Sequence, residues 1–173
     1  MAEECPPAQV YDALWGLVEG SAYFQSLVKQ GNRIKFNKQS FIPPDKIEIS
    51  TTDVPEVTLV ANQSQANLQG NSTASKLVFN YEWWISTGDV NVIRGILPVT
   101  WAIWCAMANW KNVLPLLKWS GQPFVKRYDF ITGSVLLTDS EKNRGIRGFS
   151  SIWGCEVEMW FKTDDLITQN SGA

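Results

Sequence analysis

The sequence predicts an α+β fold in which an antiparallel or mixed sheet of about four to five strands packs against an N-terminal helix and a long central helix. The segment KLVFNYEWWISTGD, from Lys76 to Asp89, alternates like a half-buried strand and leads directly into an apolar segment with helical spacing. Two more alternating segments, Phe124 to Leu137 and Gly148 to Lys162, predict an antiparallel pair near the end of the chain.

The length of 173 residues fits a single domain, because a chain of this size buries roughly 70% of its unfolded surface in one core. We expect a flexible start at residues 1–6, a helical arm at 7–30, an α+β core at 33–162 and a flexible tail at 166–173.

The helical arm begins where two prolines suit the first turn of a helix, and this first helix is expected from about Pro7 to Glu19. Val10, Leu14 and Val18 recur on one apolar stripe of it. Ser21 is a candidate N-cap for a second, short helix, and a short strand is expected at 33–36.

A β-hairpin is predicted next, because Pro55 favours extended backbone before it and Val57 and Leu59 continue as a strand that Val60 can extend. The polar segment from Asn62 to Ser75 is expected to be a long loop, and the return strand runs from Lys76 to Ser86. One face of that strand carries Phe79, Tyr81, Trp83 and Ile85.

The central helix is expected to start at a cap from Thr87 or Asp89 and to be kinked or divided by Pro98. Its expected sheet-facing side is an apolar stripe with helical spacing, made of Ile93, Leu97, Trp101, Trp104 and Ala108.

Composition argues against several classes of function. The net charge of −2 does not suit a protein that grips nucleic acid through its whole surface, so any DNA contact is expected to be local and transient. Hydrophobic residues make up 45% of the chain and include nine tryptophans, while charged residues reach only 18%, below the roughly 25% usual for soluble domains. Two interpretations stay open: the tryptophans fill a small core, or some of them are held for a partner.

The residues that catalysis most often needs are missing from the pattern. The chain has no histidine, which removes Ser-His-Asp and Cys-His systems and most catalytic zinc sites, and no Gly-rich phosphate loop. Its three cysteines are far apart. We therefore expect no enzyme activity, metal or cofactor, a reducing cytosolic setting, and no membrane span, because the longest apolar stretch, Ile96 to Met107, is too short.

Three groups of residues are candidate binding elements. The first is a cationic turn that could contact phosphates or be a solvated hairpin tip, with Lys142, Arg144 and Arg147. The second is a set of strand tryptophans that could lie at an interface or pack among neighbouring aromatics, with Trp84, Trp153 and Trp160. The third is the polar loop, with Asn62, Gln65 and Asn71.

Three segments in this order resemble the tail terminator and tail completion proteins of tailed bacteriophages. They are GNRIKF (Gly31 to Phe36), DVPEVTLV (Asp53 to Val60) and KLVFNYEWWISTGD, followed by a helix and two long closing strands. The resemblance is one of pattern and extends from about Val10 to Lys162.

The resemblance implies an α+β subunit that forms a ring, commonly a homohexamer, at the head-proximal end of the tail tube. Such a ring ends tube polymerisation and joins the tube protein to the head or neck connector, in the virion and, during assembly, in the host cytoplasm. Arg144 and Arg147 would then face the lumen or a partner. The alternative is a small Trp-rich module that binds a ligand of the carbohydrate type.

Overall fold

A computed structural model describes residues 4–34, 55–67, 73–87, 95–138 and 148–170. It contains one five-stranded sheet in the order β1-β2-β3-β7-β6. The strands are β1 (Arg33–Ile34), β2 (Glu56–Asn67), β3 (Ala74–Thr87), β7 (Gly148–Lys162) and β6 (Val125–Thr138). Only β1 pairs in parallel, with β2, and the other three pairs of this sheet are antiparallel. The predicted α+β class and strand number are confirmed.

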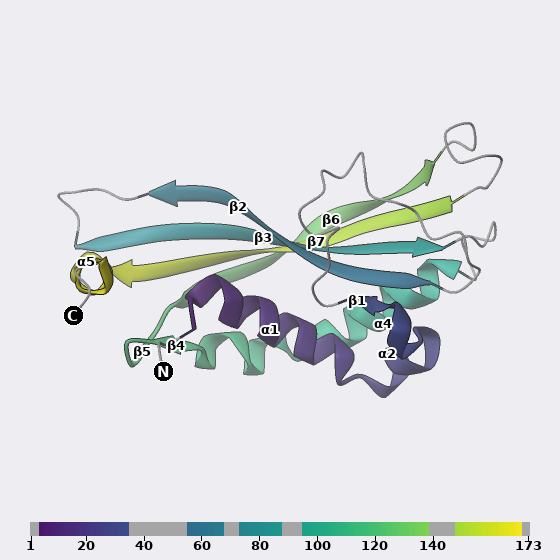
Figure 1. Cartoon of the computed structure of the whole chain (residues 1–173), viewed down its shortest axis with the longest axis horizontal. Helices are drawn as coiled ribbons and strands as arrows, with labels where there is room; N and C mark the ends of the chain where they lie inside the picture. The colour runs from purple at the N-terminus through teal and green to yellow at the C-terminus, as the bar shows by residue number, and fades with distance from the viewer. Residues whose placement is uncertain (1–3, 35–54, 68–72, 88–94, 139–147, 171–173) are drawn as a thin grey trace.

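Three helices lie together on one side of this sheet: α1 (Pro6–Glu19), α2 (Ala22–Leu27) and α4 (Leu97–Met107) (Figure 1). The predicted start of α1 is confirmed to within one residue, with prolines in its first turn. Ser21 is the N-cap of α2, and its side-chain oxygen accepts a hydrogen bond from the backbone N–H of Phe24 at 3.3 Å. Pro98 lies in the first turn of α4.

The hydrophobic core fills the space between the helices and the sheet. Tyr81, Trp83 and Ile85 are fully buried, so the predicted inward face of β3 is confirmed there. Trp15 of α1 stacks on Trp83 with ring centroids 5.6 Å apart. The Tyr81 hydroxyl donates to the Pro7 carbonyl oxygen at 2.8 Å, and burial raises the pKa of this phenol. These contacts fix α1 beneath β3.

The β2–β3 hairpin is longer than predicted. The expected loop from Asn62 to Ser75 is wrong at both ends, because β2 continues to Asn67 and β3 begins at Ala74. Pairing continues through Gln63 opposite Phe79, past a register shift, to Asn67 opposite Lys76. The polar residues at this end of β2 can belong to a strand because their side chains are exposed to solvent, while the paired strand β3 supplies the apolar side chains.

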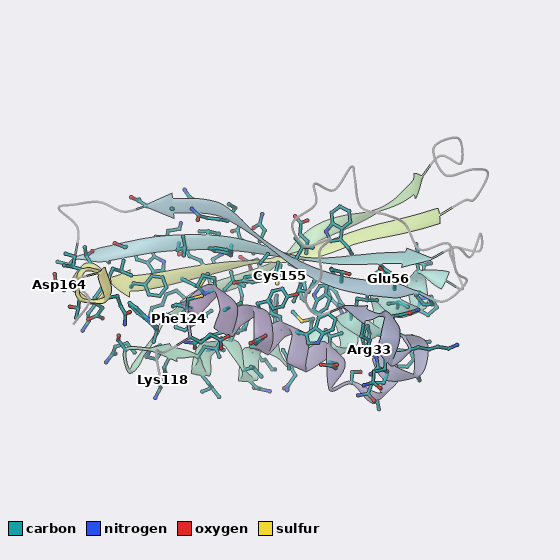
Figure 2. The ribbon with its side chains drawn as sticks, in the orientation of Figure 1. Arg33, Glu56, Lys118, Phe124, Cys155 and Asp164 are labelled. Atoms are coloured by element: carbon teal, nitrogen blue, oxygen red, sulfur yellow. The ribbon has the colours of Figure 1, made fainter. Side chains whose placement is uncertain are left out.

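The sheet is strongly twisted, so that its strands overlap near the middle of the molecule in this view (Figure 1). Figure 2 shows Cys155 at this centre, with Phe124 and Asp164 toward one end and Arg33 toward the other. Close by, a Cβ on Gly154 would lie 3.1 Å from the Tyr81 carbonyl oxygen. The close approach of neighbouring backbone therefore favours glycine at this position.

A two-stranded hairpin lies below one end of the main sheet, formed by β4 (Lys118–Trp119) and β5 (Gln122–Pro123). Its central residues, Ser120 and Gly121, have φ angles of 48° and 73°. Positive φ at both positions is typical of a type I′ turn, which reverses the chain in two residues. The turn brings Trp119 opposite Gln122.

The end of the chain differs from the expected flexible tail. Residues Thr163–Asn170 form helix α5, which packs at the end of β7. Asp164 and Asp165 occupy its first turn, where carboxylates interact favourably with the helix dipole. Its start is also held by Thr163, whose backbone N–H donates to the Thr73 carbonyl oxygen at 3.1 Å.

Candidate interaction surfaces

Helix α4 is apolar on both sides. Its buried side packs into the core through Val99, Ala102, Ile103 and Met107. Its outer side, which we call the α4 surface, consists of Leu97, Trp101, Trp104, Cys105 and Ala108.

The predicted orientation of this helix is therefore wrong for Leu97 and Trp101. Leu97 and Trp101 of the stripe expected against the sheet point outward instead, exposed by 46% and 59%, whereas Trp104, 45% exposed, contacts the sheet at β6 through Phe130. Ile93, the first residue of that stripe, lies outside the described residues. Both stripes have helical spacing, so periodicity alone could not choose between them. The stripe of Val99, Ala102, Ile103 and Met107 faces the core, where α4 packs closely against α1 and α2.

An aromatic cluster joins the α4 surface to β6, which is an edge strand. Trp104 stacks on Phe130 of β6 at 4.7 Å, and Trp110 stacks on the same ring at 4.1 Å. Trp110 also meets Tyr128 edge-on at 4.8 Å. The cluster orients Trp104 while leaving much of its ring accessible. The α4 surface is thus held in a defined geometry.

The three tryptophans proposed as interface residues do not come together. Trp84 is half-buried and Trp160 is 37% exposed, both on the sheet face away from α1. Trp84 pairs with Ile152 of β7, and Ile152 precedes Trp160 by eight residues. Trp84 and Trp160 are therefore about 26 Å apart along the strand direction. The backbone of Trp153 pairs with that of Trp83 in the sheet, and its side chain lies outside the described part.

The side chains around Trp160 form a charged network. Its indole N–H donates to the Glu158 carboxylate, and Lys76 lies 3.2 Å from the same group. These contacts, with Arg127 nearby, hold the pKa of Glu158 below its usual value. The Trp84 indole makes a similar hydrogen bond to Glu82 at 3.2 Å. Both indoles are therefore anchored by carboxylates of their own strand.

The residues proposed for the polar loop and the cationic turn have different outcomes. Asn62 and Gln65 lie within β2, so they are strand residues and not loop residues. The Gln65 side chain is exposed, beside the register shift. Asn71, Lys142, Arg144 and Arg147 lie outside the described residues.

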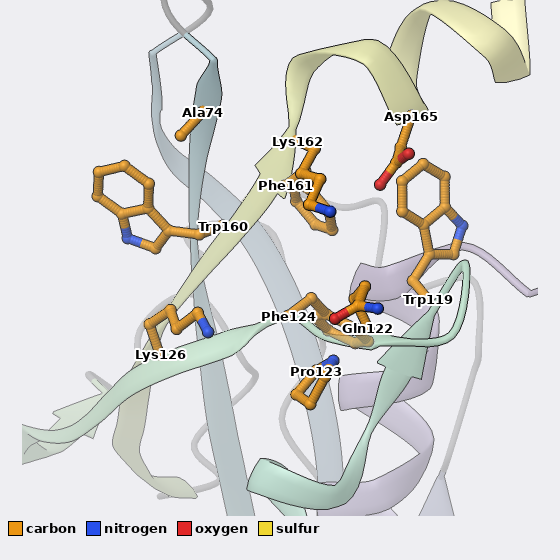
Figure 3. Close-up of a pocket in the computed structure, with 10 residues that line it drawn as sticks. All are labelled: Ala74, Trp119, Gln122, Pro123, Phe124, Lys126, Trp160, Phe161, Lys162 and Asp165. Atoms are coloured by element: carbon orange, nitrogen blue, oxygen red, sulfur yellow. The ribbon is translucent and has the colours of Figure 1, made fainter.

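A hollow of about 530 Å³ lies where β4, β5, β6, β7 and the start of α5 meet (Figure 3). Its apolar walls include Trp119, Phe124 and Phe161, which are 7%, 2% and 8% exposed. Trp160 flanks it, and Lys126 and Lys162 reach it from β6 and β7. Gln122 and Asp165 complete the polar part of the lining.

Sequence reasoning identified Trp160 but missed the rest of this hollow. Trp119 and Lys162 are far apart in the sequence, and only the I′ turn and the β6–β7 pairing bring them together. One local signal was present, because Ser120-Gly121 between polar and aromatic residues suits a tight turn.

The described residues contain no group of three or more His, Cys, Asp or Glu side chains placed to hold a metal ion. No helix within the described ranges is long and apolar enough to cross a membrane. A scan against models of known protein families finds no match for this chain, and a comparison with curated protein sequences finds none either.

Proposed function

We propose that this chain is a structural virion assembly protein that caps a phage tail tube, ends its polymerisation and forms the joining face to the head or neck. In this proposal the subunits form a ring, which we expect to be a homohexamer, and contact the tail tube protein on one side and the connector on the other. The protein acts by assembly and not by turnover, in the host cytoplasm and then in the virion.

The observation that carries the proposal is the α4 surface. Two tryptophans and a leucine on one helical stripe are about half exposed, although the helix already buries its opposite stripe. Large exposed apolar patches are typical of protein–protein contacts, and tryptophan is enriched among residues that dominate binding energy. A second copy of the chain is the occupant that ring assembly requires.

The two flanks of the molecule support a head-to-tail contact. One flank carries edge strand β6 and the α4 surface, joined by the stack of Trp104 on Phe130. The other carries β2 and α1, joined by the Tyr11 hydroxyl, which donates to the Leu59 carbonyl oxygen at 2.7 Å. Because the flanks differ, a contact between them is heterologous, and repeating such a contact closes a ring when the rotation allows. A contact of the α4 surface with itself would instead give a two-fold dimer.

The first experiment measures solution mass by light scattering over a concentration series, with negative-stain imaging of the large species. We expect rings for the natural sequence and monomers for the Leu97→Ser/Trp101→Ser double variant. Tyr23→Ser is the matched control, because Tyr23 is 45% exposed but lies on α2. Assembly of the double variant with the natural affinity would refute the role of the α4 surface.

A second experiment tests the capping role directly. Tail tube protein from the same genome is polymerised with increasing amounts of this chain, and tube lengths are measured from micrographs. A capping subunit shortens the tubes and appears at one end of each. Tubes of unchanged length and bare ends, with folded protein present, would contradict the proposed function even if rings form.

The ligand-binding alternative has one observation in its favour, the hollow beside Trp160. Its volume falls within the roughly 300–1,000 Å³ usual for small-molecule sites. A monomer whose tryptophan fluorescence responds to a sugar would favour this alternative over a ring.

A further inference from the structure

From the geometry and charge of this hollow, we infer that it binds a small aromatic carboxylic acid, with the ring against Trp119, Phe124 and Phe161 and the carboxylate between Lys126 and Lys162. This inference does not depend on the proposed function, because the hollow shares no residue with the α4 surface.

The three rings of the aromatic wall, Trp119, Phe124 and Phe161, already pack against one another in the absence of a ligand. Trp119 meets Phe161 edge-on at 5.4 Å, and Phe124 stacks on Phe161 at 5.8 Å. The backbone N–H of Trp160 donates to the Phe124 carbonyl oxygen at 2.9 Å, which joins the start of β6 to β7. Rings that already hold one another lose little freedom when a further ring packs against them.

The charged side chains that line the hollow, Lys126, Lys162 and Asp165, form its rim and determine which ligand charge it favours. Figure 3 shows Lys126 below Trp160, Lys162 between Trp160 and Asp165, and Asp165 beside Trp119. Two lysines against one aspartate leave the lining with a net charge of +1. Neither lysine is ion-paired within the described part of the chain. The lining therefore favours an anion over a neutral or cationic group.

A sugar fits this lining less well. Sugar platforms need a broad exposed aromatic face, but Trp119, Phe124 and Phe161 are at most 8% exposed because they pack on one another. Trp160 is more exposed, but its indole N–H is already bonded to Glu158. An aromatic body that packs against ring edges, with one anionic end, matches both the wall and the rim.

The test compares 3-phenylpropionate with its neutral amide and with 2-phenylethylamine, each titrated up to about 20 mM, a range suited to weak fragments. Binding is followed by the indole N–H signals of Trp119 and Trp160 in nitrogen-15 spectra, assigned with Trp119→Phe and Trp160→Phe. We expect the acid to bind about threefold to tenfold more tightly than the amide and the amine to bind most weakly. No shift of either indole, or equal affinity for acid and amide, would overturn the inference.

Variants then assign the charge preference to individual residues. Lys126→Gln and Lys162→Gln should each weaken acid binding about threefold or more, while Asp165→Asn should strengthen it. Lys111→Gln is the control, because Lys111 is an exposed lysine on a short helical turn outside the hollow. Equal acid binding by all four variants would refute the assigned rim.

A final titration identifies the source of the carboxylate. The peptide acetyl-Ala-Ala-Phe offers the same ring and carboxylate as the end of a protein chain. Affinity equal to or weaker than that of 3-phenylpropionate supports a free small molecule. Binding more than about tenfold tighter would overturn that assignment in favour of a partner's C-terminus.

Discussion

Helices α1 and α4 lie on the same side of the same sheet, yet the residues on their outer faces differ in polarity. α1 buries Val10, Leu14 and Trp15, and its outer side ends in residues such as Glu19 that suit water. α4 buries one stripe and presents two exposed tryptophans on the other. An amphipathic helix is completed by the sheet and solvent, whereas a helix that is apolar on both sides has a second face available for a partner.

The largest expected effect is a loss of folding stability when the buried side of α1 is altered. Trp15→Ala removes a side chain that is 3% exposed and stacked on Trp83, leaving a cavity in the core. We expect a loss of about 3–5 kcal/mol in the free energy of unfolding, measured by urea denaturation. A loss below about 1 kcal/mol would mean that α1 does not depend on this stack.

The sharpest test compares the two sides of α4 itself. Ile103 is fully buried, so Ile103→Ala should cost about 2–5 kcal/mol of unfolding free energy without directly touching the α4 surface. Trp101→Ser, on the 59% exposed residue, should change the stability of the monomer by about 0.5 kcal/mol or less and weaken self-association. Denaturation at low concentration and light scattering at high concentration separate the two effects. Similar stability losses in both variants would mean that the two sides are not distinct.

Cysteine reactivity reports on the same comparison without perturbing the packing. Cys105 is exposed on the α4 surface and Cys5 is exposed before α1, while Cys155 is fully buried and its burial raises the pKa of the thiol to about 12. Near pH 8 a thiol reagent should modify Cys5 and Cys105 at least about a hundredfold faster than Cys155.

The concentration dependence of this reaction is the informative part. Cys105 should react more slowly as the protein assembles, while Cys5 serves as the internal reference in the same sample. The Cys105→Ser variant identifies which signal belongs to which thiol. Unchanged Cys105 reactivity in an assembled sample would place the contact elsewhere.

The smallest expected effect is a change in stability from Glu158, on the sheet face that α1 and α4 do not cover. The pKa of Glu158 is lowered by the Trp160 indole and by Lys76, so its stabilising effect is present above the unfolded pKa of about 4.3 and is lost as the pH falls below it. Glu158→Gln should therefore cost about 0.5–1 kcal/mol at pH 7 and less at pH 3.

This pH dependence is measured by urea denaturation of both proteins at each pH. A second cycle in a Lys76→Met background should give a smaller difference, because one partner of the carboxylate is then absent. An equal cost at pH 7 and pH 3 would show that the Glu158 charge does not contribute.

Local patterns were sufficient for much of the fold. The alternation at Tyr81, Trp83 and Ile85 identified the inward face of β3, because a strand with one buried face must alternate. Ser21 was recognised as a cap because few residues suit that position. The strand at Asn62 and Gln65 was missed, because its stability comes from pairing with β3 and not from its own propensity.

The sequence by itself determined the α+β class, the pairing of β2 with β3 and of β6 with β7, and the apolar character of α4. These follow from periodicity and from single residues with strong conformational preferences. Only the tertiary structure decided which side of α4 is buried in the core and that Trp119, Lys126 and Lys162 share one hollow. When a helix is apolar on both sides, or when side chains distant in the chain converge, the choice depends on packing against other elements, and local sequence does not contain it.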